Sequence, residues 1–97
     1  MRAIHSFRIA ADHPCLAGHF PGRPIVPGVL VLDHALRAID AEIPLGWPLR
    51  LGRVKFTAPL LPGEAATVLV GEPRDRRLAF ACEGPEGRIM QAAVELA

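Results

Sequence analysis

One stretch of the sequence decides the fold: residues 27–42, which read PGVLVLDHALRAIDAE. Proline followed by glycine is typical of a helix start, because proline has no N–H to leave unpaired there. At about 100° per residue, the apolar side chains share one broad arc, and Asp33, Arg37 and Asp40 form a narrow stripe opposite them. The pattern predicts a helix over residues 28–42 that is covered around most of its circumference.

Strand-like runs lie on both sides of this helix. One precedes it at residues 4–11. Four follow it, at 49–58, 65–72, 76–83 and 88–96. The pairs Pro62-Gly63 and Gly84-Pro85 predict short turns between these runs. Parallel strands would need crossover helices that the chain lacks, so we predict an antiparallel sheet. Residues 12–27 are rich in proline and glycine and are expected to form an extended, rigid loop.

The composition limits the class of protein. A chain of 97 residues is expected to form a single domain over residues 1–97, and 51% hydrophobic residues are too many for a disordered chain. A net charge of +1 argues against a nucleic-acid partner. The apolar excess predicts that a second subunit or a ligand covers part of the surface.

The same sequence indicates the compartment. No apolar run is long enough to span a membrane, and the first residues lack the apolar stretch of a signal peptide. Two cysteines, Cys15 and Cys82, cannot form a disulfide framework. We therefore expect a cytoplasmic protein with free thiols.

The most informative motif leads into the helix. Residues 18–30 read GHFPGRPIVPGVL, and Asp33 lies fourteen positions after His19. Residues 53–64, RVKFTAPLLPGE, add a weaker match. Together they resemble the signature of the 3-hydroxyacyl-acyl carrier protein dehydratases of bacterial fatty acid synthesis. In that family a His-Phe turn leads to a Pro-Gly helix start, and an acidic residue follows on the helix.

The resemblance implies a hotdog fold of the α+β class, in which an antiparallel sheet wraps around one central helix. It also implies a homodimer with two active sites at the subunit interface. There His19 would be the base, Asp33 of the other subunit the acid, and Gly28 the donor to the thioester carbonyl. The implied substrate contacts are Phe20, Pro27, Val29 and Arg37. The substrate would be carried on acyl carrier protein or, as a weaker option, on coenzyme A, with no metal and no other cofactor.

These residue types suit the dehydration of a 3-hydroxyacyl thioester to a 2-enoyl thioester. Imidazole is largely neutral at pH 7, so His19 can remove the weakly acidic α-proton. The N–H of Gly28 can donate to the carbonyl oxygen, helped by the positive end of the helix dipole. As an acid, Asp33 would need burial in an apolar pocket to keep its proton.

Two departures from the family pattern leave other functions open. The chain is shorter than typical members, and Arg37 stands where they carry glutamine, four residues after Asp33. We predict an i,i+4 ion pair that holds the carboxylate ionised and weakens it as a proton donor. One alternative is a hotdog thioesterase in which Asp33 activates water or attacks the thioester. The other is a non-catalytic acyl-binding or assembly subunit.

Two remaining groups of polar residues favour simpler interpretations. His13, Cys15 and His19 match no familiar zinc spacing, so no metal site is predicted. Residues 74–77, RDRR, predict a solvated hairpin turn. Their alternative role is to dock an acidic carrier protein, a role that is equally open to three further arginines. These are Arg23, Arg50 and Arg53.

Overall fold

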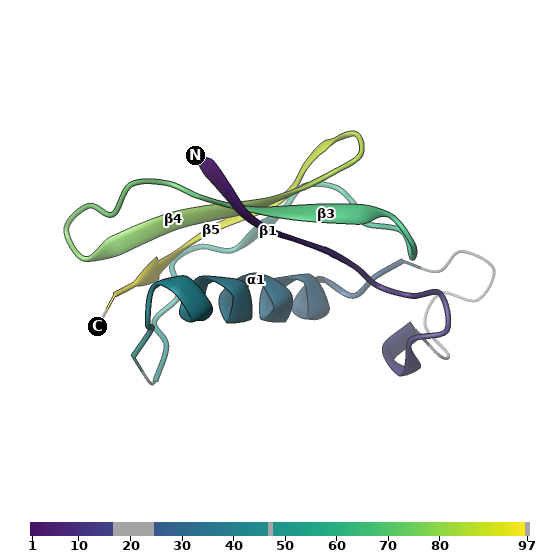
Figure 1. The fold of residues 1–97 in the computed structure, drawn as a ribbon, viewed down its shortest axis with the longest axis horizontal. Helices are drawn as coiled ribbons and strands as arrows, with labels where there is room; N and C mark the ends of the chain where they lie inside the picture. The colour runs from purple at the N-terminus through teal and green to yellow at the C-terminus, as the bar shows by residue number, and fades with distance from the viewer. Residues whose placement is uncertain (17–24, 47, 97) are drawn as a thin grey trace.

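The computed structural model describes residues 1–16, 25–46 and 48–96. Within them, a five-stranded antiparallel sheet lies over one α-helix (Figure 1). The elements, in chain order, are β1 (Arg2–Arg8), the short 3-10 helix η1 (Pro14–Leu16), α1 (Gly28–Glu42), β2 (Lys55–Phe56), β3 (Ala65–Val70), β4 (Arg77–Gly84) and β5 (Gly87–Glu95). The strand order in the sheet is β1-β3-β4-β5-β2.

The helix α1 has the bounds that the sequence predicts. It begins after Pro27, whose carbonyl accepts the first helical hydrogen bonds, and it ends at Glu42. The helix contacts β1, β3 and β4, and it buries Val31, Ala35 and Ile39 against them. Within one chain the sheet therefore covers one side of the helix only. Val29, on the flank, is 74% exposed.

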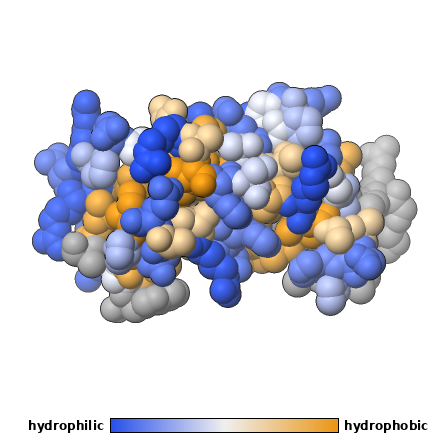
Figure 2. All heavy atoms as spheres, in the orientation of Figure 1, coloured by the Kyte–Doolittle hydropathy of each residue, from blue (hydrophilic) through white to orange (hydrophobic). Residues whose placement is uncertain are grey.

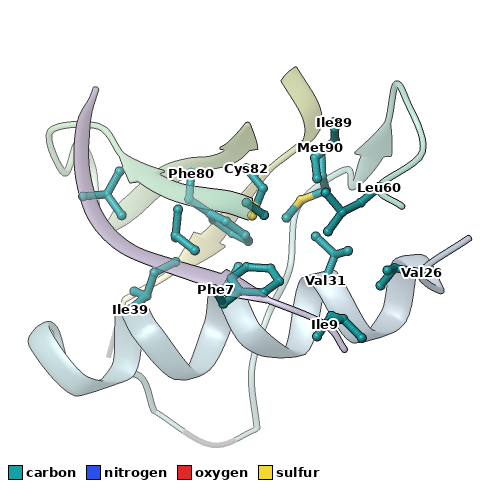
Figure 3. Packing of buried hydrophobic residues seen from close by; sticks show 14 of the residues in the cluster. Phe7, Ile9, Val26, Val31, Ile39, Leu60, Phe80, Cys82, Ile89 and Met90 are labelled. Atoms are coloured by element: carbon teal, nitrogen blue, oxygen red, sulfur yellow. The ribbon is translucent and has the colours of Figure 1, made fainter. Parts of the chain in front are cut away.

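The core lies between the helix and the sheet. Figure 3 shows Val31 pointing from α1 toward Leu60 and Met90, with Phe80 and Cys82 further along the sheet. On β3 every second residue is buried, as expected for a strand with one face on the core. This packing fixes the helix against the sheet and so fixes the position of its first turn.

The predicted strand at residues 49–58 is wrong for most of its length. Only Lys55–Phe56 forms a strand, and Leu51 makes a single isolated bridge to β5. Between them Gly52 N–H donates to the Ala93 carbonyl at 2.7 Å, but no continuous ladder forms. Glycine inside a strand weakens it, and this strand lies at the edge of the sheet, where only one neighbour supports it.

The turn at Pro62-Gly63 does not join neighbouring strands, which corrects the expectation of successive short hairpins. β2 pairs with β5, whereas β3 lies between β1 and β4, so residues 57–64 cross the sheet. The Gly63 N–H donates to the Ile9 carbonyl at 2.8 Å, and the Gly63 carbonyl accepts from Arg8 Nη1 at 2.6 Å. These bonds attach the crossover to the end of β1.

The remaining turns agree with the sequence more closely. Residues 74–77 form an exposed hairpin turn between β3 and β4, as predicted. The turn between β4 and β5 lies at Pro85-Glu86, one residue later than expected. The loop before the helix is not wholly extended, because residues 14–16 form η1; its residues 17–24 lie outside the described part of the chain. No helix among the described residues is long and apolar enough to cross a membrane.

Candidate active site

A hollow of about 600 Å³ lies at the N-terminal end of α1. Its walls come from residues 25–31, from residues 56–60 at the end of β2 and just after it, and from Ile89 on β5. The Val26 N–H donates to the Leu60 carbonyl at 2.9 Å, which joins two of these walls. The hollow therefore lies where the start of the helix, the crossover and the sheet meet.

The first turn of α1 contributes Gly28 and Val29 to the lining of this hollow. Pro27 O accepts the N–H groups of Leu30 and Val31, at 3.0 and 3.3 Å. The amides of Gly28 and Val29 precede these, in the turn where helical N–H groups have no intrahelical acceptor. Both residues line the hollow. The positive end of the helix dipole thus lies in largely apolar surroundings, which suits a carbonyl oxygen that gains negative charge.

The ring of Phe56 packs against Gly28. A Cβ atom built on Gly28 would lie 2.8 Å from Cε1 of this ring, so a side chain at position 28 would require the ring to shift. Glycine at position 28 therefore allows the ring to approach the helix. Gly28 is thus required for packing as well as being the predicted donor to the thioester carbonyl. Phe56 belongs to the RVKFTAPLLPGE segment, but its place at the hollow depends on long-range strand pairing that the sequence pattern did not show.

Asp33 and Arg37 lie together on the exposed stripe of the helix. Arg37 Nε donates to Asp33 Oδ2 at 2.9 Å, which confirms the predicted i,i+4 ion pair. The Asp33 side chain is 52% exposed in the single chain, so the pair is a surface ion pair worth about 0.3–0.5 kcal/mol. The two residues border a second hollow, of about 240 Å³. Next to it, the Leu45 N–H donates to Asp40 Oδ1 at 2.7 Å and fixes the chain after the helix.

The structure brings the predicted site residues together in two groups. Gly28 and Val29 share the first hollow, whereas Asp33 and Arg37 border the second. Asp33 lies five positions after Gly28, which places the two residues about 140° apart around the helix. One chain alone therefore does not present the amide and the carboxylate to one cavity among the described residues.

Three more predicted residues complete this comparison. Pro27 is the N-cap residue of α1 and orients the first turn. His19 and Phe20 lie outside the described residues. The roles of His19 as base and of Phe20 as substrate contact stay predictions.

Other titratable groups near the helix serve packing. His34 stacks on Phe7 with ring centroids 4.4 Å apart. Cys82 is buried, and burial raises the pKa of its thiol to about 12, so it is a poor nucleophile. Among the side chains that the structure describes, no three from His, Cys, Asp or Glu gather in a way that could hold a metal ion.

Comparison with protein families decides the relationship. A family model described as "ApeI-like: ApeI dehydratase" matches residues 1–93, almost the whole chain. The chain belongs to the ApeI-like dehydratase family. Family membership accounts for the motif around the start of α1, which resembles that of the 3-hydroxyacyl-acyl carrier protein dehydratases.

Curated relatives are also similar to this chain. The 3-hydroxyacyl-[acyl-carrier-protein] dehydratase FabZ of Herpetosiphon aurantiacus is 33% identical over 86 residues, covering 79% of this chain and 60% of the relative. FabZ of Haemophilus influenzae is 33% identical over 78 residues, covering 71% of this chain and 53% of the relative. The chain thus spans little more than half the length of the curated relatives that it matches.

A solved structure supports the fold. The dehydratase heterocomplex ApeI:P from Xenorhabdus doucetiae contains a chain with a TM-score of 0.79 and 22% sequence identity, covering 99% of this chain and 96% of that one. The match confirms the predicted hotdog fold, an antiparallel sheet against one central helix.

Proposed function

We propose that this protein dehydrates a 3-hydroxyacyl thioester to the 2-enoyl thioester. The observation that carries the proposal is the apolar hollow at the start of α1, where the Gly28 amide lies in the first helical turn. Such a site suits an acyl thioester, because its carbonyl needs a hydrogen-bond donor and its chain needs apolar walls. Membership of the ApeI-like dehydratase family supports the same reaction.

In this proposal His19 removes the proton from C2 of the substrate. The electron pair of the broken C–H bond moves into the thioester, and the Gly28 N–H stabilises the resulting oxyanion. The pair then returns to form the C2–C3 double bond, and the 3-hydroxyl leaves as water with a proton from Asp33. Since Asp33 Oδ2 accepts the Arg37 N–H, the transferred proton comes from Oδ1. Proton exchange with solvent restores His19 and Asp33.

The proposed site needs two chains. Gly28 and Asp33 border different hollows of one chain, so a second copy has to supply the carboxylate. Accessible apolar side chains support such an assembly, since Val29, Leu51 and Phe56 are 74%, 39% and 51% exposed. Figure 2 shows apolar surface between polar side chains on one face of the molecule. A homodimer would cover part of this surface and the open flank of α1.

The proposed substrate is carried on an acyl carrier protein in the cytoplasm, with coenzyme A as the weaker option. Arginines that could dock an acidic carrier lie at the far end of the molecule from Gly28, where the β3–β4 turn and the end of β5 border a hollow of about 420 Å³. Arg50 and Arg76 line it, and Arg74 and Arg77 flank the exposed turn. Complementary charge would guide the carrier to this surface.

One assay tests the reaction. Purified protein is incubated with 3-hydroxyacyl thioesters of several chain lengths, and both enoyl formation and free thiol release are followed. We expect enoyl product, reduced at least about 100-fold by His19→Ala and by Asp33→Asn, as is usual for a lost acid–base group. Enoyl product that survives both substitutions would contradict the assigned roles.

The Asp33–Arg37 ion pair favours one second candidate, a thioesterase. The ion pair positions the Asp33 carboxylate on the exposed face of α1, where it could activate water or attack a carbonyl. This function predicts thiol release without enoyl product in the same assay. No product in either channel would instead indicate a binding or assembly subunit.

A further inference from the structure

Phe56 lies at the contact between the hollow and the first residue of α1. We propose that its ring determines which acyl groups are accepted, by admitting an unbranched C2 and excluding a substituent there. This inference rests on the proposed function, since it assumes that a thioester carbonyl binds at the Gly28 amide. It adds a specificity-determining residue that the sequence motifs did not indicate.

The backbone at Phe56 is held by pairing with β5. Phe56 pairs with Met90 in the ladder between β2 and β5. The next residue, Thr57, donates its N–H to the Ile89 carbonyl at 2.9 Å and its hydroxyl to the Arg88 carbonyl at 2.9 Å. The backbone that carries the ring is therefore held by β5, its one neighbour in the sheet.

The ring occupies the space of one methyl group beside the helix. A Cβ on Gly28 would lie 2.8 Å from Cε1 and 2.9 Å from Cζ of Phe56. Gly28 and Phe56 line the same hollow, so a thioester whose oxygen accepts from the Gly28 N–H would hold C2, the carbon next to the carbonyl, in the space that the ring borders. A hydrogen on C2 fits beside the ring, whereas a methyl group competes with it for the same volume.

Selection at this point depends on shape. Among the described residues that line the hollow, Thr57 carries the one polar side chain, and its hydroxyl already donates a hydrogen bond to the Arg88 carbonyl. In an apolar pocket, one additional methyl or methylene group changes kcat/KM by about 10- to 200-fold. We therefore expect a preference for the unbranched substrate at the lower end of this range.

The exposure of the ring makes it a suitable position for mutation. The Phe56 side chain is 51% exposed and lies outside the buried core, so a smaller residue leaves the core intact. Leu61 provides a matched control, because it is 47% exposed and borders a different hollow, of about 290 Å³.

The test compares dehydration of two pantetheine thioesters, 3-hydroxybutyryl and 2-methyl-3-hydroxybutyryl. Both carry a C2 proton, so both can react. The wild type is expected to favour the unbranched thioester by about tenfold or more in kcat/KM. Phe56→Ala reduces this ratio by at least about fivefold, Phe56→Leu gives an intermediate ratio, and Leu61→Ala leaves it unchanged. A general loss of structure would lower both rates and leave their ratio alone.

Two results would overturn the inference. One is a wild type that uses both thioesters equally, and the other is an active Phe56→Ala variant whose ratio stays within about twofold of the wild type.

A binding experiment separates this inference from the proposed reaction. If the wild type forms no enoyl product, the proposed function fails, and binding is measured instead with pantetheine analogues in which an amide N–H replaces the sulfur. Titrations of butyryl and 2-methylbutyryl amides, followed by NMR, should show preference for the butyryl amide in the wild type and its loss in Phe56→Ala. The inference is also overturned if the wild type and Phe56→Ala show the same preference between the two amides, or if the wild type binds neither amide.

Discussion

Because the Cys82 thiol is buried, the free energy of unfolding of the protein decreases as the pH rises through the alkaline range. The thiol has an ordinary pKa of 9.0, and burial raises it to about 12 in the folded chain. The folded state therefore binds the proton more tightly than the unfolded state, and the stabilisation is complete below pH 9. It is lost as the pH rises from about 9 to 12.

The expected result is a steeper loss of stability in the wild type than in Cys82→Ala. Over this pH range the free energy of unfolding of the wild type should fall by about 1.4 kcal/mol per pH unit relative to the variant. Urea denaturation at several pH values between 7 and 11 measures the difference. If the free energies of unfolding of the two proteins changed in parallel with pH, burial would not be raising the pKa of the Cys82 thiol in the folded chain.

At the scale of single residues, spacing along the sequence predicts contacts within one helix well and contacts between distant segments poorly. The Asp33–Arg37 pair followed from residues one helical turn apart. The contact of Phe56 with Gly28 did not follow, because β2 has to pair with β5 before the ring reaches the helix. The sequence thus located the carboxylate and the amide, but not the ring that packs against Gly28.

Among the elements, the β3–β4 turn carries local strain. Asp75 and Arg76 have φ angles of 50° and 62°, in the left-handed region that favours glycine. Arg74 and Arg77 close the turn with backbone hydrogen bonds of 2.9 and 2.8 Å. This geometry is a two-residue hairpin turn that matches the twist of the strands.

Arg76→Gly should therefore stabilise the protein. Relief of the positive φ outweighs the added entropy of the unfolded chain, for a net gain of about 1 kcal/mol. Thermal unfolding measures the gain as a higher Tm. Arg74→Gly serves as the control, because Arg74 is not among the positive-φ residues. This variant relieves no strain and adds entropy to the unfolded chain, so it should be less stable than the wild type. Equal losses in both variants would contradict strain at position 76.

Helical periodicity predicted α1 to the residue, because both its ends depend on neighbouring residues: Pro27 at the start and the Ile43 N–H to Ile39 bond at the end. The strand at residues 49–58 failed for the opposite reason. The segment has residue types that favour a strand, but it lies at the sheet edge, where its one neighbour is β5. How much of it forms a strand therefore depends on pairing with β5 rather than on its own sequence. Periodicity also gave no sign that the chain crosses the sheet between β2 and β3.

For the whole molecule, the proposed dimer makes a prediction about mixed subunits. His19→Ala and Asp33→Asn should each be inactive, but unfolding and refolding them together should restore activity. Random pairing makes about half of the dimers mixed, and each mixed dimer has one intact site of two. We expect about a quarter of wild-type activity in the enoyl assay. No recovery, with mixed dimers confirmed by mass spectrometry, would place both residues in one chain.

The sheet order has a consequence for the synthesis of the chain. Because β2 pairs with β5, the strand that carries Phe56 leaves the ribosome well before its partner does. Val31, Ala35 and Ile39 likewise emerge on α1 before β3 and β4 can cover them. The nascent chain therefore carries a bare apolar helix until its C-terminal strands are translated, and chaperones that bind such segments have their longest access to it during that interval.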